Sequence, residues 1–118
     1  MNLIKPPKLT PGDKVATVSL SWGGVGNSDI RWRYDLGVSR LKSVFGLEAV
    51  AMTHSFMGQD YLRDHPKDRA RDLMEAFTDP SIKGIIANIG GNDSIRLLPF
   101  IDFDVIRNPK SLPTNTAN

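Results

Sequence analysis

The sequence predicts an α/β protein with a parallel, Rossmann-like or flavodoxin-like sheet and flanking helices. Three apolar segments rich in β-branched residues have the composition of strands. They alternate with segments whose apolar residues recur every three or four positions, which is typical of helices that bury one face. A length of 118 residues, 40% of them hydrophobic, and a net charge of +2 fit one small domain with a core.

The first predicted strand spans residues 14–20 and follows the turn signal Pro11-Gly12-Asp13. Its residues are mostly apolar and β-branched, as expected for a strand buried in a sheet. A glycine-rich loop, residues 21–27, comes next. In parallel sheets, ligands bind at the carboxyl ends of strands, which is where this loop would lie.

A helix is predicted between Ile30 and Phe45, where apolar residues recur at helical spacing. The hydroxyl of Ser28 can cap its first turn by accepting an unpaired N–H. Gly46 is the predicted C-terminal cap. Residues 47–53 form the second predicted strand.

Segment 54–65 is polar and contains glycine, which predicts a loop. Pro66 suits the first turn of a second helix, and Asp79-Pro80 is expected to end it. The predicted buried face of this helix consists of Ala70, Leu73, Met74 and Phe77.

Residues 82–89 form the third predicted strand, 94–98 a short helix, and 102–107 the start of another helix. Residues 111–118 are small and polar without any period, so we expect a disordered or truncated tail. Three strands make a thin sheet, which suggests that the fold is incomplete.

Ser94 is the main catalytic candidate. The strand 82–89 is followed by Gly90-Gly91, which allow a sharp turn, and a helical pattern begins at Ser94. A hydroxyl at the apex of a strand-turn-helix can be a nucleophile elbow, and the first N–H groups of a helix favour negative charge. The alternative is that Ser94, or Asp93 before it, only caps the helix.

A serine nucleophile needs a base, and within this chain the base could only be His54 or His65. His54 follows a predicted strand, so it could lie at the same edge of the sheet as Ser94. His65 precedes Pro66 at a helix start, where an exposed structural role is expected. Geometry decides whether a Ser–His pair forms.

Other ligand signals are weak. The glycines at positions 23, 24 and 26 match neither a dinucleotide nor a Walker motif, and the lysine of the latter is missing. Trp22 could stack on a base or pack against the domain. Arg96 could face solvent or hold an anion. Four acids recur at a spacing of four but are interrupted by Pro66, which favours solvated acids over a metal site: Asp60, Asp64, Asp68 and Asp72.

Composition narrows the function classes. The chain has no cysteine, so disulfides, thiolate catalysis and cysteine zinc sites are excluded. Its basic residues are scattered, so no nucleic-acid partner is expected. No segment approaches the length of a membrane span and no signal peptide is visible, so we expect a cytoplasmic protein without a membrane partner.

Four segments resemble the LD-carboxypeptidase family of serine peptidases: Pro6–Ser19, Tyr61–Arg63, Arg69–Ile86 and Gly90–Ile106. Their order and spacing agree with the family, and the resemblance covers residues 3–110. The form Ile-Gly-Gly-Asn-Asp-Ser is closer to the microcin C self-immunity branch than to the murein tetrapeptide branch, which more often has Arg-Gly-Gly-Tyr-Gly-Ser.

The resemblance implies that Ser94 is the nucleophile of a Ser–Glu–His triad and forms an acyl-enzyme. The backbone N–H of Ile95 is the first implied oxyanion donor, and that of Gly91 the second. No metal and no cofactor is implied. The candidate substrate contacts are Gly90, Asn92, Asp93 and Trp22.

In the immunity branch, the implied substrate is a peptidyl- or aspartyl-nucleotide, cut at the bond that joins aspartate to the adenylate. In the other branch it is the L,D bond of a cell-wall tetrapeptide. A non-catalytic module that binds a nucleotide or anion at the glycine loops is the alternative from another class.

The family's Glu and His lie in a second domain that follows this one. Residues 1–110 are therefore expected to form an N-terminal nucleophile domain with the C-terminal domain absent. The chain alone is then expected to have little or no activity. Without that domain, an exposed apolar face could support a homodimer.

Overall fold

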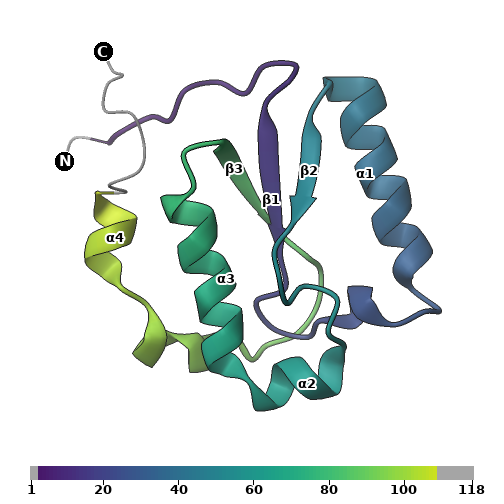
Figure 1. Ribbon diagram of the computed structural model, residues 1–118, viewed down its shortest axis with the longest axis vertical. Helices are drawn as coiled ribbons and strands as arrows, with labels where there is room; N and C mark the ends of the chain where they lie inside the picture. The colour runs from purple at the N-terminus through teal and green to yellow at the C-terminus, as the bar shows by residue number, and fades with distance from the viewer. Residues whose placement is uncertain (1–2, 109–118) are drawn as a thin grey trace.

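Three parallel strands form the sheet, in the order β2–β1–β3 (Figure 1). They are β1 (Lys14–Val18), β2 (Glu48–Ala51) and β3 (Ile82–Ala87), and β1 pairs in parallel with both neighbours. The computed structural model describes residues 3–108, and the predicted tail at 111–118 lies outside them. The predicted α/β class is confirmed.

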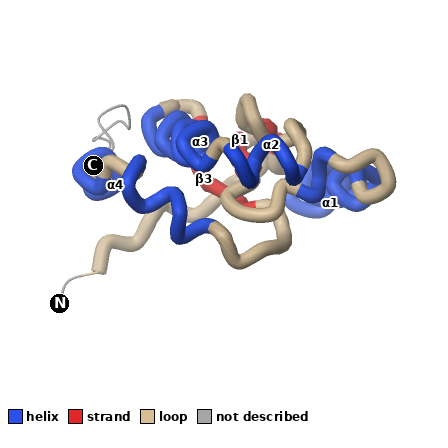
Figure 2. The backbone as a smooth tube through the Cα atoms, turned by 90° about the horizontal axis from the view of Figure 1, so that it is seen from below, coloured by secondary structure: helices blue, strands red, loops and turns tan. Residues whose placement is uncertain are grey.

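Helices surround this sheet. The α-helices are α1 (Arg31–Phe45), α2 (Gln59–Asp64), α3 (Pro66–Thr78) and α4 (Phe103–Arg107), and the 3-10 helices are η1 (Gly24–Gly26) and η2 (Ser94–Phe100). Figure 2 shows α1 and α4 at opposite ends of the molecule, with the strands between them. Among residues 3–108, the helices lack the length and apolar character needed to cross a membrane.

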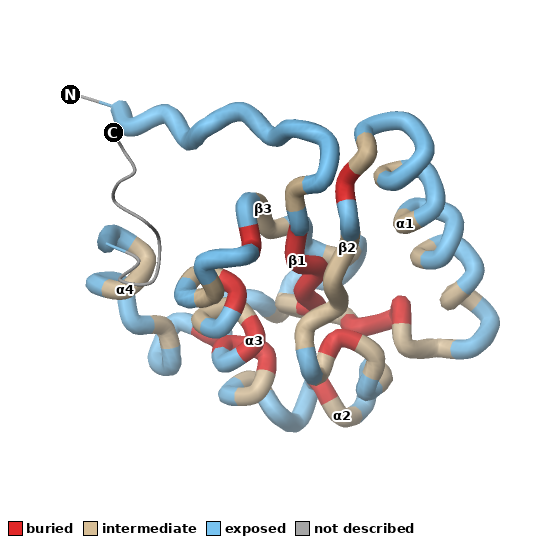
Figure 3. Tube along the Cα trace, turned by 45° about the horizontal axis from the view of Figure 1, so that its top comes forward, coloured by how far each residue is buried: buried red, intermediate tan, exposed pale blue. Residues whose placement is uncertain are grey.

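The two faces of β1 contact different helices, because successive side chains of a strand point to opposite faces. Ala16 and Val18 form a buried cluster with Ala76 of α3. On the other face, the hydroxyl of Thr17 lies 2.8 Å from that of Tyr34 in α1. Figure 3 shows that the buried residues gather in β1 and α3, whereas α1 contains none.

Helix α1 confirms the predicted segment and its C-terminal cap, but not its N-terminal cap. Gly46 has a φ of 69° and donates its N–H to the carbonyls of the last turn. Ser28 is not the cap, because the helix starts later, after Ile30. The carbonyl of Asn27 accepts the N–H groups of Ile30 and Arg31 instead.

Helix α3 begins at Pro66 and ends before Asp79, as predicted. Its buried face is rotated from the predicted one and consists of Arg69, Ala70, Asp72 and Ala76. The predicted Leu73, Met74 and Phe77 are half-buried. Two charged side chains take interior positions because they bind partners in neighbouring loops.

The predicted strands are each too long, and the predicted loop 54–65 contains α2. Just beyond the ends of the strands, side chains make hydrogen bonds in place of the backbone ladder. The Ser19 hydroxyl donates to the carbonyl of Ser55, and the Asn88 amide donates to the Ser19 hydroxyl. Helix α2 was missed because it has six residues and buries only Leu62, which is too short a pattern for periodicity. The short helices predicted after β3 are confirmed.

Candidate active site

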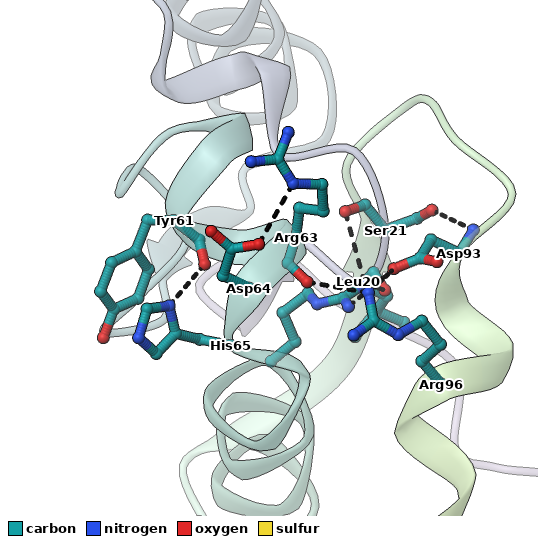
Figure 4. A network of polar contacts seen from close by, with 9 residues as sticks. Leu20, Ser21, Tyr61, Arg63, Asp64, His65, Asp93 and Arg96 are labelled. Atoms are coloured by element: carbon teal, nitrogen blue, oxygen red, sulfur yellow. Dashed lines mark hydrogen bonds and ion pairs between the residues drawn. The ribbon is translucent and has the colours of Figure 1, made fainter.

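The loops that follow β1 and β3 meet at the carboxyl edge of the sheet. The N–H of Trp22 donates to the carbonyl of Gly90 at 3.2 Å, and the N–H of Asp93 donates to the hydroxyl of Ser21 at 2.7 Å. The two glycine-containing loops therefore lie side by side, as the parallel topology predicts. Figure 4 shows Ser21, Asp93 and Arg96 together in this network.

Two glycines allow the turn that precedes Ser94. Gly90 has a φ of 109° and Gly91 a φ of 98°, a region that other residues rarely adopt. A Cβ at Gly90 would collide with the ring of Trp22, and one at Gly91 with the hydroxyl of Ser21. Both conformation and space therefore require glycine here.

Ser94 is exposed and begins η2. Its hydroxyl makes no hydrogen bond to any residue between 3 and 108, and Asp93, at the N-cap position, makes no side-chain cap bond. The simple cap interpretation of these two residues is thus wrong. Within the described chain no residue other than glycine has a positive φ, so the unusual backbone lies before Ser94.

The two implied oxyanion donors have no hydrogen-bond partner within the described part of the chain. Neither the N–H of Gly91 nor that of Ile95 has an acceptor among residues 3–108. Ile95 is 69% exposed and lies in the first turn of η2. Both N–H groups can therefore donate to a bound oxygen.

Most of the candidate substrate contacts line one cavity of about 410 Å³ beside this turn. Its walls are Ser21, Trp22, Gln59, Asp60, Arg63, Gly91, Asn92 and Asp93. Of the predicted contacts, Gly90 does not line it. Gly90 instead borders a mainly apolar cavity of about 490 Å³ between α1 and β3.

The indole of Trp22 packs against the backbones of Gly24 and Gly90, where added Cβ atoms would meet its ring. Its N–H donates to the side chain of Gln59. Trp22 therefore fixes the loop and presents only part of its surface to the cavity that it lines.

Neither histidine pairs with Ser94. The Nδ1 of His54 lies 2.8 Å from a carboxylate oxygen of the buried Asp72, and the carboxylate also accepts the backbone N–H of His54. The Nδ1 of His65 lies 2.6 Å from the carbonyl of Tyr61 (Figure 4). The in-chain Ser–His pair that the sequence left open does not form.

The four spaced acids bind other side chains and do not form one cluster. Asp60 and Asp64 pair with Arg63. Asp68 accepts the hydroxyl of Tyr61 at 2.6 Å. That bond holds the pKa of Asp68 below its ordinary value and raises the pKa of Tyr61.

Sequence reasoning missed Arg69, whose side chain is fully buried beside the turn. Its guanidinium donates to the carbonyl of Leu20 at 3.0 Å and to the carboxylate of Asp93 at 2.9 Å. Arg96 donates to the same carboxylate oxygen at 3.3 Å and to the carbonyl of Arg63 at 2.9 Å. Its guanidinium therefore binds groups of the protein itself. The sequence could have indicated that Arg69 is buried, because it lies beside Ala70 on the apolar side of α3.

Comparison with known proteins shows the family of the chain. Residues 15–113 match the model of the LD-carboxypeptidase N-terminal domain. A relative named "Putative carboxypeptidase" from Synechocystis sp. is 31% identical over 109 residues, which are 92% of this chain and 35% of that protein. The chain thus spans about a third of the length of this curated relative.

Two solved structures also resemble the chain. An MccF-like protein from Streptococcus pneumoniae in complex with AMP has 42% identity and a TM-score of 0.72, over 81% of this chain and 26% of that one. Microcin C7 self-immunity protein MccF in complex with aspartyl sulfamoyl adenosine has 28% identity and a TM-score of 0.68, over 92% and 32%. Because the family model covers most of the sequence and the fold agrees, the chain belongs to the LD-carboxypeptidase family, whose N-terminal domain it matches.

Proposed function

We propose that this chain supplies the nucleophile, Ser94, of a serine hydrolase that cleaves an amide bond. The observation that carries the proposal is the turn itself. Ser94 is exposed, its hydroxyl has no hydrogen-bond partner in the described chain, and the nearby N–H groups of Gly91 and Ile95 have no acceptor among residues 3–108. A nucleophile and an oxyanion site are needed together for acyl transfer.

In the proposed reaction, the Oγ of Ser94 attacks the carbonyl carbon of the substrate amide. The carbonyl oxygen becomes an oxyanion that accepts hydrogen bonds from Ile95 and Gly91. The C–N bond then breaks, and the nitrogen leaves with the proton that a base removed from Ser94. Water hydrolyses the resulting ester, which releases the acid and restores Ser94.

The base is proposed to come from outside residues 3–108. His54 binds Asp72 and His65 contacts the carbonyl of Tyr61, so neither is placed to accept a proton from Ser94. The family resemblance implies a Glu and a His in a second domain. We therefore expect residues 1–118 alone to turn over little or no substrate.

The substrate is proposed to be a peptidyl- or aspartyl-nucleotide that reaches the enzyme in the cytoplasm. Two similar structures hold AMP and aspartyl sulfamoyl adenosine, and both belong to MccF or an MccF-like protein. The cavity of about 410 Å³ beside the turn offers a place for a small ligand, with Arg63 and Asn92 among its walls.

Cleavage of the L,D bond of a cell-wall tetrapeptide is the second candidate, and the family description favours it. The two candidates require different leaving groups, a sulfonyl- or phosphoryl-linked nitrogen in one and a D-amino acid in the other. Assays of the two compounds with the same enzyme preparation therefore separate the candidates, according to which compound is hydrolysed.

The test uses the intact protein, expressed from the complete reading frame that contains these residues. We expect it to release aspartate from aspartyl sulfamoyl adenosine, and Ser94→Ala to lower this rate by roughly a thousandfold or more. Ser43→Ala, a change at an exposed serine of α1, is the matched control and is expected to keep the rate. Mass spectrometry of the products measures both.

Unchanged turnover in Ser94→Ala would exclude Ser94 as the nucleophile. Release of a D-amino acid from the tetrapeptide, with no hydrolysis of the adenosine compound, would favour the second candidate. Binding of AMP without hydrolysis of either compound would support a non-catalytic module instead.

A further inference from the structure

The buried guanidinium of Arg69 binds the residue that directly precedes the proposed nucleophile. Nη2 of Arg69 donates to the carboxylate of Asp93 at 2.9 Å, and Asp93 directly precedes Ser94. Nη1 donates to the carbonyl of Leu20 at 3.0 Å, in the loop after β1. One side chain from α3 therefore joins the loops at the ends of β1 and β3.

The turn formed by residues 90–93 is held at both ends. At its start, the carbonyl of Gly90 accepts the N–H of Trp22. At its end, Asp93 binds Ser21 through its N–H and Arg69 through its carboxylate. Between these ends, Gly91 and Asn92 make no hydrogen bond to residues 3–108, so the position of the Gly91 N–H depends on the two anchors.

Stability alone is a poor explanation for a buried arginine at this place. Removing a guanidinium from water is costly, and an apolar side chain of similar size often packs as well or better. Arg69 has an exposure of 0%, and its Nε has no partner among residues 3–108. What the planar guanidinium provides is a fixed direction for each hydrogen bond.

We propose that Arg69 is a positioning residue for the proposed hydrolase. It holds Asp93, and through Asp93 it keeps the Gly91 N–H and the Ser94 hydroxyl in the one arrangement that can attack and stabilise a carbonyl group. The inference rests on the proposed function, because it assigns Arg69 to the geometry of that reaction.

The first experiment measures kinetics of the intact protein with aspartyl sulfamoyl adenosine. We expect Arg69→Met to lower kcat by about 100-fold with little change in KM, because displacement of a reacting group by about 1 Å can have that effect. Asp93→Asn should lower kcat as well, and the double variant should be no worse than Arg69→Met, since both changes disrupt one contact.

Arg71→Met is the matched control. Arg71 lies on the same helix, is 56% exposed, and forms an ion pair with Asp68 at 3.7 Å rather than with a residue of the turn. We expect it to keep the wild-type kcat. If Arg69→Met also keeps the wild-type kcat, or loses no more than Arg71→Met, the proposal is wrong.

A second experiment does not depend on activity. Backbone ¹⁵N relaxation should give order parameters near 0.85 for residues 90–94 in the wild-type protein and below about 0.6 in Arg69→Met, with β1 unchanged. Unchanged order parameters would overturn the positioning role. If the wild-type protein hydrolyses nothing, the proposed function fails, while this measurement still decides whether Arg69 fixes the turn.

Arg69→Lys covers the case in which Arg69→Met does not fold. Lysine keeps the positive charge but lacks two donors in one plane, so it cannot hold Leu20 and Asp93 in the same geometry. We expect a folded protein with reduced kcat and mobile residues 90–94. Full activity and a rigid turn in Arg69→Lys would show that charge alone is enough and would contradict the proposal.

Discussion

Gly91 shows how much of the candidate site depends on single residues. Its φ of 98° and the nearby hydroxyl of Ser21 leave no room for a Cβ. Its N–H is also one of the two proposed oxyanion donors. A substitution at Gly91 therefore tests the backbone of the turn without removing a functional side chain.

We predict that Gly91→Ala destabilises the protein by about 1–3 kcal/mol, because alanine is strained at this φ. Gly37→Ala is the matched control, since Gly37 lies inside α1 and an added Cβ would meet no atom of another element within 4 Å. It should stabilise the protein by about 0.5–1 kcal/mol, because alanine favours a helix interior. Urea denaturation measures both, and equal effects of the two changes would refute the explanation.

At the scale of elements, polar side chains join the helices to each other and to the strands. Tyr61 of α2 donates its hydroxyl to Asp68 of α3 at 2.6 Å, and the carboxylate of Asp72 binds His54 in the loop after β2. These contacts place α2 and α3 together at the carboxyl edge of the sheet. The bond from Tyr61 also lowers the pKa of Asp68, which makes the stability of the fold depend on pH.

We predict that Tyr61→Phe raises the pKa of Asp68 toward its ordinary value of 3.8, because the hydroxyl is the main cause that lowers it. A lowered pKa in the folded state stabilises the fold fully above the unfolded pKa, and this stabilisation is lost as the pH falls through the folded pKa. The unfolding free energy should therefore depend less on pH below about 4 in the variant.

Carbon-detected NMR titration of the carboxyl groups measures this change directly. The pKa of Asp79 is the internal control, because hydrogen bonds from Ser81 lower it and the substitution does not touch them. An unchanged pKa for Asp68 in Tyr61→Phe would contradict the assignment.

At the scale of the whole molecule, the core is unevenly divided between the two faces of the sheet. The cluster of Ala16, Val18, Ala76 and Ile82 lies on the α3 face. On the α1 face, a cavity of about 490 Å³ separates residues such as Val38 and Leu41 from β3. Helix α1 therefore has less buried contact than α3.

We predict that the amide hydrogens of α1 exchange with solvent faster than those of β1. None of the residues of α1 is buried, and an isolated helix of 15 residues is marginal in water. Hydrogen exchange followed by NMR on residues 1–118 measures the difference. Equal protection of α1 and β1 would show that the helix is held more firmly than its burial indicates.

The sequence by itself determined the α/β class, the positions of the three strands, and the helices that begin after Ile30 and at Pro66. It could do so because strand composition and helical periodicity depend on residues close together in the chain. The family resemblance then pointed to Ser94, and the family of the chain is confirmed.

Only the tertiary structure decided which side chains meet around Ser94. Arg69 binds Leu20, 49 residues away, and Asp93, 24 residues away, while His54 turns to Asp72. Local patterns could not give these contacts, because the parallel topology brings strand ends together that are distant in the sequence. The free energy of burying a charged group depends on the partners found there, and so the positions of Arg69 and His54 follow from the fold.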